Sequence, residues 1–269
     1  MNTSTTNAST ISSSRDIFLI TTVLNLIFGL PSNVYVLQMI ARAGSEALAS
    51  DFFGLNLALI EILFCLLSVA IIVQSNLKLY MSLLLFSSGF VYVGRPWFQC
   101  CICLERYLAV VHPVVFLRYK LLRYKMVCSG VVWVLVIGVS LLSLKFLDFV
   151  YIHSIYICSN ILILFSVNVF CCLAVLRVLK SPAPGDGDRE KKATNNIKMR
   201  AFRIILMMLL LMGINYIPII ITVPFVKFFT FEMYNNLCNT AFFIIVITAI
   251  AQPMIYIHRA GKLPCSKYQ

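Results

Sequence analysis

Charged residues inside or at the end of long apolar runs are the most informative feature of this sequence. Glu105, Arg106 and Tyr107 follow one another at the end of such a run, whereas Glu61 and Arg95 each lie within one. An ionised side chain at the bilayer centre costs about 2.5–3.5 kcal/mol on insertion scales, so it needs a partner or a function. The chemistry that these residues predict is ion pairing and hydrogen bonding between helices.

The other reactive residue types form no catalytic or metal-binding pattern. The histidines, His112, His153 and His258, share no helix turn, and no Cys-x-x-Cys pair is matched by a second pair. Most of the ten cysteines lie in apolar runs, where cysteine usually behaves as a small hydrophobe. We therefore expect no metal, no cofactor and no enzyme activity.

The composition is typical of an integral membrane protein. Of the 269 residues, 61% are hydrophobic and only 12% are charged, and the mean hydropathy is +0.93. Soluble domains contain roughly 25% charged residues. The formal net charge of +12 does not indicate a nucleic-acid partner, because the basic residues fall in short loops between the apolar runs.

Seven apolar runs predict seven transmembrane helices, because a helix needs about 20 apolar residues to cross a bilayer. The runs cover residues 17–40, 52–73, 79–104, 127–144, 149–176, 201–226 and 237–257. The predicted fold class is an all-α membrane protein, a seven-transmembrane helix bundle over residues 17–257. The charged stretch 182–196, which contains proline and glycine, is predicted to be a flexible cytoplasmic loop.

The distribution of Lys and Arg predicts that the N-terminus lies outside and the C-terminus in the cytoplasm. In that orientation most of the 22 basic residues lie on the cytoplasmic side. Residues 1–16 then form an extracellular tail, in which Asn2 and Asn7 begin glycosylation sequons. Residues 258–269 form a short cytoplasmic tail, in which Cys265 is either a palmitoylation site or an unmodified thiol. We expect a multi-pass protein of the plasma membrane.

The predicted helices carry polar and proline residues that solubility in lipid does not require. They are Asn33, Glu61, the triplet Glu105-Arg106-Tyr107, Tyr216 with Pro218, and Gln252-Pro253 followed by Tyr256. As a set and in this order they resemble the marks of the rhodopsin-like (class A) G-protein-coupled receptors, over about residues 17–257. Arg106 matches the arginine of the Asp/Glu-Arg-Tyr motif, and Pro253 and Tyr256 match the Asn-Pro-x-x-Tyr motif.

The resemblance implies a receptor that transmits an extracellular, small or apolar chemical signal to a heterotrimeric G protein. Arg106 would engage the G protein once the inner end of the sixth helix moves outward, with Pro218 as the kink and Tyr256 as a support. The expected partners are thus a G protein, an unknown extracellular ligand and the lipid bilayer. The family's ligand pocket would be lined by Ser88, Tyr92, Ile219, Val223 and Phe242.

Several family marks are absent. The outer end of the third helix, near Lys78, has no cysteine, so Cys158 either pairs with Cys238 or both remain free thiols. Tyr216 and Gln252 replace the family's usual tryptophan and asparagine.

The inner end of the sixth helix also differs from some relatives. Lys198 and Arg200 lie where those relatives have an acidic residue. An ionic contact from this helix to Arg106 is therefore ruled out, and Arg106 is expected to rely on Glu105 and other partners.

Glu61 and Arg95 are predicted to meet in the bilayer. Glu61 lies ten residues from Asp51, and Arg95 lies eleven residues from Arg106. At 1.5 Å per residue both are about 15–16 Å from the cytoplasmic ends of antiparallel helices, which predicts an ion pair. In the family this depth often holds a sodium ion, and we interpret Arg95 as a fixed positive charge that replaces it. The alternative is that Arg95 contacts a carbonyl group or water.

Two other functions remain as alternatives. A membrane transporter would show paired half-repeats with broken helices, and the sequence shows no such repeat. A degraded, non-signalling relative of the receptors is favoured by the absent cysteine and by Gln252.

Overall fold

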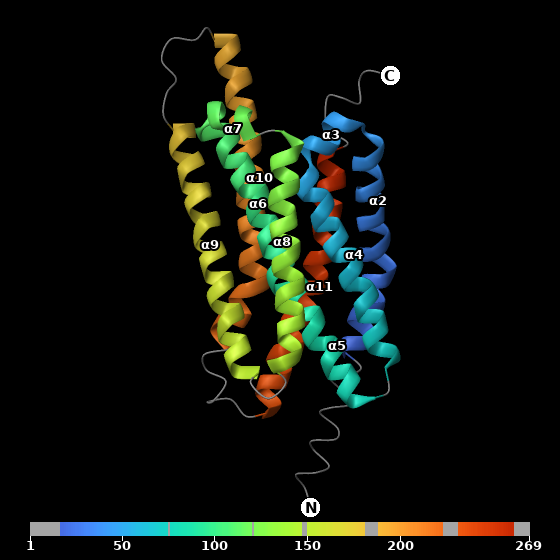
Figure 1. The fold of residues 1–269 in the computed structure, drawn as a ribbon. Helices are drawn as coiled ribbons and strands as arrows, with labels where there is room; N and C mark the ends of the chain where they lie inside the picture. The colour runs from blue at the N-terminus through green and yellow to red at the C-terminus, as the bar shows by residue number, and fades with distance from the viewer. Residues whose placement is uncertain are drawn as a thin grey trace, which may run out of the picture.

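The described part of the chain is a bundle of long helices that run roughly parallel or antiparallel to one another (Figure 1). The structure is a computed structural model, and it describes residues 17–74, 76–119, 121–146, 150–180, 188–222 and 231–260. The short helices α3 and α7 lie together at one end of the bundle, and α5 begins at the opposite end. We name these ends the α3–α7 end and the α5 end.

The elements follow the apolar runs of the sequence. In chain order they are the π-helical turn η1 (Asn25–Gly29), α2 (Leu30–Arg42), α3 (Ser45–Ser50), α4 (Phe52–Val73), α5 (Leu77–Gly89), the π-helical turn η2 (Phe90–Gly94), α6 (Arg95–Val111), α7 (Pro113–Tyr119), α8 (Leu122–Ser143), the 3-10 turn η3 (Leu144–Phe146), α9 (Val150–Lys180), α10 (Asp188–Thr222) and α11 (Phe231–Ala260).

Six helices of the described part are long and apolar enough to cross a membrane. They are Ile17–Arg42, Phe52–Val73, Leu122–Ser143, Ser154–Leu179, Met199–Ile221 and Asn239–Ile257. They overlap six of the seven predicted spans, with bounds that differ by up to about five residues. The predicted third span, 79–104, falls on α5, η2 and α6, which follow one another without a gap in the chain. Its crossing of the membrane stays a prediction, as does the side on which each terminus lies.

The prediction of a flexible loop over residues 182–196 is wrong from Asp188 onward, where α10 begins. The first residues of this extension include Glu190, Lys191 and Ala193, all strong helix formers. Their propensity outweighs the charge density on which the loop prediction was based. Residues 181–187 lie outside the described residues.

Local signals explain where two of the helices begin. Asn76 caps α5, because its Oδ1 accepts hydrogen bonds from the backbone N–H groups of Lys78 at 3.0 Å and Leu79 at 3.3 Å. Gly44, between α2 and α3, has φ +90°, a conformation that glycine adopts without steric cost.

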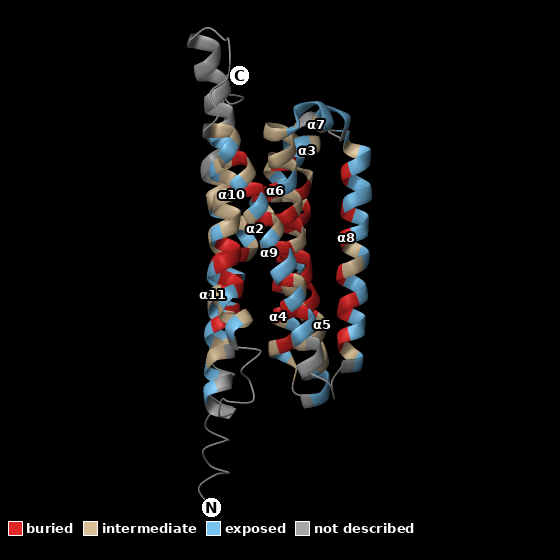
Figure 2. Cartoon of the chain, turned by 90° about the vertical axis from the view of Figure 1, so that its left-hand side faces the viewer, coloured by how far each residue is buried: buried red, intermediate tan, exposed pale blue. Residues whose placement is uncertain are grey.

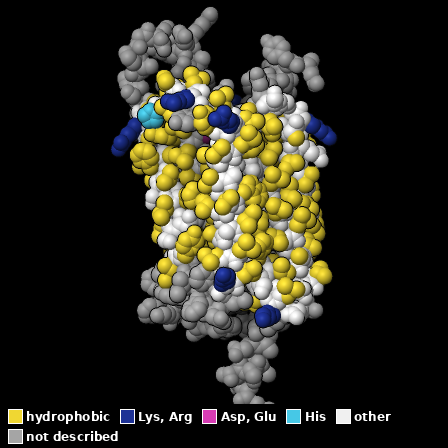
Figure 3. Space-filling model, viewed as in Figure 1, with side chains coloured by type: hydrophobic (Ala, Val, Ile, Leu, Met, Phe, Trp, Pro, Cys, Tyr) yellow, Lys and Arg dark blue, Asp and Glu magenta, His cyan; other side chains and the backbone are white. Residues whose placement is uncertain are grey.

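The buried residues face the interior of the bundle, and the exposed ones face outward (Figure 2). The largest core cluster includes Phe98, Val136 and Ile245, which are fully buried and come from α6, α8 and α11. Gly89 allows α5 to approach α8, since a Cβ there would lie 3.0 Å from the Val136 carbonyl oxygen. On the outer face shown in Figure 3, hydrophobic side chains cover the middle, and Lys and Arg lie toward the two ends. This pattern fits a bundle surrounded by lipid.

Candidate functional site

One carboxylate joins three helices at the α3–α7 end. Asp51, immediately before α4, accepts a hydrogen bond from Arg106 Nη2 of α6 through Oδ1, at 3.2 Å. Its Oδ2 accepts a second hydrogen bond, at 2.8 Å, from the hydroxyl of Tyr256 on α11. The Arg106 and Asp51 side chains are each 27% exposed, so solvent reaches this ion pair. Asp51 thus holds Arg106 and Tyr256, two residues that the sequence singled out near the predicted inner ends of their helices.

Glu105 has a different partner from the one expected. It forms an ion pair with Lys125 at the start of α8, with 2.8 Å between Oε1 and Nζ. Lys125 Nζ also donates to the carbonyl groups of Ala49 at 2.7 Å and Ser50 at 3.2 Å. The expectation that Arg106 relies on Glu105 and other partners is therefore wrong for Glu105, because consecutive helical residues point about 100° apart and reach different neighbours. The other partner is Asp51. Lys125 attaches α3 and α6 to α8.

A cavity of about 720 Å³ opens among α2, α4, α6, α10 and α11 at the α3–α7 end. Its lining includes Asp51, Arg106, Arg200, Arg203 and Tyr256 near this end. Glu61, Asn33 and Gln252 line it deeper in the bundle. Asp51, Arg106 and Tyr256, which we name the Asp51 cluster, therefore lie on the wall of this cavity. The cavity extends toward the buried polar residues around Glu61, which we name the polar centre.

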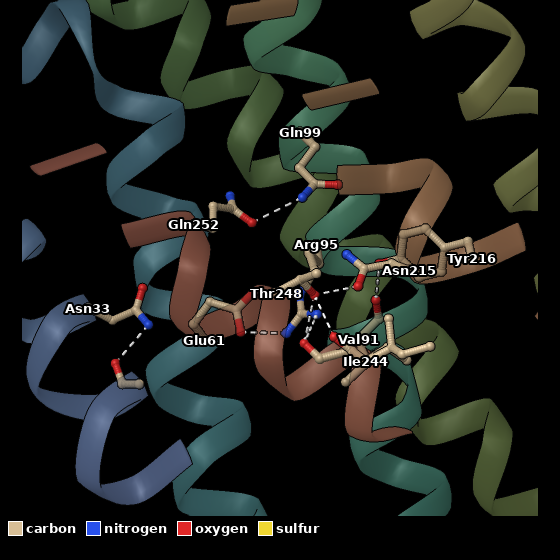
Figure 4. Close-up of polar contacts among 12 residues, drawn as sticks. Asn33, Glu61, Val91, Arg95, Gln99, Asn215, Tyr216, Ile244, Thr248 and Gln252 are labelled. Atoms are coloured by element: carbon tan, nitrogen blue, oxygen red, sulfur yellow. Dashed lines mark hydrogen bonds and ion pairs between the residues drawn. The ribbon is translucent and has the colours of Figure 1, made fainter. Parts of the chain in front are cut away.

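Glu61 and Arg95 meet in that polar centre (Figure 4). Arg95 Nη2 donates to Glu61 Oε2 at 2.6 Å, and Nε lies 2.5 Å from Oε1. The side chains are 1% and 3% exposed, so the charges are removed from solvent. Arg95 Nη1 also donates to the carbonyl of Ile245 on α11, at 3.2 Å. The two readings of Arg95, an ion pair and a carbonyl contact, therefore both describe it.

Polar contacts also tie α10 to its neighbours. The hydroxyl of Tyr216 donates to the backbone carbonyl of Val91 in η2 at 2.8 Å. The adjacent Asn215 accepts a hydrogen bond from the hydroxyl of Thr248 on α11 through its side-chain oxygen. Figure 4 shows both contacts beside Arg95. The turn η2 and the helices α10 and α11 are thus linked at one level of the bundle.

Gln252 connects the polar centre to the cavity. Its Oε1 accepts a hydrogen bond from Gln99 Nε2 of α6 at 3.1 Å, and its side chain lines the cavity. Pro253 follows it inside α11, and Pro218 lies inside α10. A proline within a helix removes one backbone hydrogen bond and favours a kink.

A family model described as 7 transmembrane receptor (rhodopsin family) matches residues 32–256. This range contains the Asp51 cluster, the polar centre and both intrahelical prolines. The chain belongs to the rhodopsin family of seven-transmembrane receptors. A comparison with curated proteins finds no match. The protein is thus a multi-pass membrane protein of signal transduction, a class A G-protein-coupled receptor.

The receptor's predicted ligand-pocket residues are only partly brought together. Tyr92, Ile219 and Phe242 pack against the same hydrophobic core cluster. Phe242 also stacks on Phe18 of the first helix, with ring centroids 4.8 Å apart. Ser88 donates to the carbonyl of Leu85 within its own helix, at 2.6 Å.

Other predicted positions of the receptor have local contacts or lie beyond the described residues. The hydroxyl of Tyr107 is 3.2 Å from His112 Nε2. Asn33 donates to the carbonyl of Gly29 in its own helix. Cys158 is a buried free thiol. The predictions for Asn2, Asn7, Val223 and Cys265, and those for the side chains of Lys198 and Cys238, fall outside the described residues.

Sequence reasoning missed Asp51 and Lys125 as parts of this site. Asp51 was used only to count the depth of Glu61 along its helix. Lys125 was one of the basic residues that were assigned to the cytoplasmic side as a group, with no partner predicted for it. Lys125 is only 4% exposed. Its burial could have been suspected from its position beside an apolar run, since the preceding predicted helix ends near the acidic residue Glu105. Among the described residues, no group of three or more His, Cys, Asp and Glu is arranged to hold a metal.

Proposed function

We propose that this receptor transmits an extracellular, small or apolar chemical signal to a heterotrimeric G protein. The observation that carries the proposal is the position of Arg106 on the cavity wall, where Asp51 holds it beside Tyr256. The excess of basic residues supports a cytoplasmic position for the α3–α7 end, in a plasma-membrane protein with its N-terminus outside. Arg106 then faces the compartment that contains the G protein.

Outward movement of α10 at the α3–α7 end is the proposed activating step. Arg200, Arg203 and Met207 of α10 line the cavity, so its displacement would widen the entrance. Pro218 supplies the kink at which the helix would bend, because its ring leaves the carbonyl of Ile214 without the usual backbone donor. A ligand at the α5 end would shift the equilibrium by its differential affinity for the two arrangements.

The proposed ligand site lies toward the α5 end, between the core residues Tyr92, Ile219 and Phe242. Its apolar character supports a small hydrophobic or lipid-like ligand. Ser88 and Val223 are proposed as further lining residues. Glycosylation at Asn2 and Asn7, and palmitoylation at Cys265, are proposed for the two tails on the basis of the sequence.

The test is constitutive G-protein activation in cells, comparing the wild type with Arg106→Ala at matched surface expression. We expect the variant to lose the wild-type signal. Arg42→Ala is the control, because Arg42 is an exposed basic residue in the last turn of α2 and does not line the cavity. A surface-expressed wild type without signal in any G-protein class, or a signal that Arg106→Ala leaves unchanged, overturns the proposal and favours a non-signalling relative.

A further inference from the structure

In both π-helical turns of the described chain, a proline is the second residue after the turn. In η1 the N–H of Leu30 bonds to the carbonyl of Asn25, and Pro31 follows. In η2 the N–H of Arg95 bonds to the carbonyl of Phe90, and Pro96 follows. Each bond spans five residues instead of the four of an α-helix. A proline ring clashes with the carbonyl four residues earlier, and the wider turn relieves that clash.

The turn η2 leaves a buried backbone carbonyl without its usual donor. In an α-helix, Val91 would accept a hydrogen bond from the N–H of Arg95, but that N–H is bonded to Phe90. In a continued π-helix the donor would be residue 96, which is a proline and has no N–H. Val91 is 4% exposed, so water does not readily replace the missing donor.

The hydroxyl of Tyr216 supplies the missing hydrogen bond, at 2.8 Å from the Val91 oxygen. Tyr216 lies on α10 two residues before Pro218, and it is 1% exposed. The contact therefore attaches the kink region of α10 to a turn of the neighbouring helix (Figure 4). Because the acceptor is a backbone atom, it cannot rotate away as a side chain could.

The same turn positions Arg95. This residue ends the π-helical hydrogen bonding and begins α6, with its side chain against Glu61 of α4 and the Ile245 carbonyl of α11. A change from π-helical to α-helical hydrogen bonding in η2 would rotate the helix on one side of the turn relative to the other. Such a change would therefore alter the contacts of both the Tyr216 hydroxyl and the Arg95 guanidinium.

We propose that the Tyr216–Val91 hydrogen bond is a lock that holds α10 against the turn η2 in the arrangement seen here, and that it opens when the receptor is activated. This inference rests on the proposed function, because opening is defined by outward movement of α10. The lock requires a hydroxyl at position 216, since a phenylalanine fills the same space and leaves the Val91 carbonyl without a donor. The Val91 carbonyl is available as the acceptor because Pro96 favours the wider turn, in which the N–H of Arg95 bonds to Phe90 instead.

The first test is Tyr216→Phe, with basal G-protein signalling measured at matched surface expression. We expect an increase of about two- to tenfold, the range for losing one net hydrogen bond. Tyr35→Phe is the matched control, because Tyr35 is an exposed tyrosine on α2 and loses the same hydroxyl away from the lock. The control should signal like the wild type.

The second test asks whether Pro96 creates the need for the hydroxyl. Pro96→Ala restores an N–H and permits α-helical bonding, in which Arg95 donates to Val91. In that background Tyr216→Phe should have little further effect, so the two substitutions should be strongly non-additive. Equal effects of Tyr216→Phe in the wild-type and Pro96→Ala backgrounds overturn the lock.

A third measurement tests the lock independently of G-protein signalling. Hydrogen exchange of the purified receptor in detergent measures opening of residues 90–98 without any G protein. Faster exchange of this segment in Tyr216→Phe, but not in Tyr35→Phe, supports the lock even if the wild type never signals. Unchanged exchange in Tyr216→Phe overturns the lock, whatever the signalling assay shows.

Discussion

The hydroxyl of Tyr256 donates a hydrogen bond to Asp51 at 2.8 Å, through the carboxylate oxygen that Arg106 does not use. The family resemblance assigns Arg106 to engagement of the G protein and Tyr256 to supporting the outward movement of the sixth helix. Here the same carboxylate restrains both, and it comes from the start of α4 rather than from α10. Since α10 has Arg200 and Arg203 on the cavity wall, the described part of this helix could repel Arg106 rather than attract it.

Asp51→Ala is expected to raise basal signalling. The substitution releases Arg106 and Tyr256 together, and it costs no helix cap, because the Asp51 side chain makes no capping hydrogen bond. Hydrogen bonds to charged groups contribute about 1.5–3 kcal/mol, reduced here by the partial exposure of the pair. We expect an increase of about fivefold in basal G-protein activation at matched surface expression. Basal activity equal to that of the wild type would contradict the role given to Asp51.

Glu105→Gln is expected to lower the thermal stability of the receptor and to raise basal signalling less than Asp51→Ala does. Glu105 pairs with Lys125 and not with Arg106, so its loss loosens the attachment of α3 and α6 to α8. Both charges are largely buried, and glutamine would offer Lys125 a neutral acceptor in place of the carboxylate, which leaves the buried Lys125 charge without its counter-charge. We expect a fall of several degrees in the melting temperature of the detergent-purified receptor. If Glu105→Gln raises basal signalling as strongly as Asp51→Ala, the different roles assigned to Glu105 and Asp51 are wrong.

The sequence was sufficient to predict contacts that depend only on helix rise. Glu61 and Arg95 were matched by depth alone, and the structure brings them into contact. The contact of Arg106 with Asp51 could not be predicted in this way, since it depends on how α4 and α6 are rotated about their axes. No partner was predicted for Lys125 for the same reason, because nothing in the chain shows which side of α8 faces α3.

Irregular backbone was also beyond sequence reasoning. Pro96 predicts a disturbed helix, but whether the helix kinks or takes a wider turn depends on what packs against it. In this receptor Tyr216, 120 positions later in the chain, provides the donor that stabilises the wider turn. The helical start of α10 at Asp188 was missed because charge density was given more weight than helix propensity. Tertiary contacts therefore decide the form of the helix near Pro96, whereas local helix propensity decides where α10 begins.

Glu61→Leu is expected to destabilise the receptor more than the double substitution Glu61→Leu with Arg95→Leu. The single change leaves the Arg95 charge buried with only a carbonyl acceptor. Removing one partner of a buried pair costs about 3–5 kcal/mol, whereas replacing both by apolar residues is often neutral. Thermal unfolding of the purified receptor measures the difference. Gln99→Leu, which removes the neutral hydrogen bond to Gln252, is the control and should have the smaller effect.

If the single and the double variant lose the same stability, the Arg95 charge is satisfied without Glu61. Water entering from the cavity would then be its partner, since Glu61 lines that cavity. Equal losses would therefore contradict the ion pair as the main reason for keeping both charges.

Basal signalling of the wild type is expected not to respond to sodium, whereas Arg95→Ser should create a response. In the family a sodium ion often binds at the depth of Glu61 and stabilises the inactive state. Here the Arg95 guanidinium contacts both oxygens of the Glu61 carboxylate and supplies the positive charge permanently. Serine would remove that charge and add a hydroxyl, leaving an acid that a small cation can neutralise.

The measurement is basal G-protein activation in membranes, with sodium replaced by a large organic cation at constant ionic strength. Constant ionic strength is needed because general screening also changes the Asp51–Arg106 pair, which is partly exposed. Arg95→Ser with Glu61→Gln is the control, since it lacks the acid and should again be insensitive. A wild type whose signalling falls as sodium rises contradicts the interpretation of Arg95 as a built-in cation, because the guanidinium would then not occupy the place of the ion.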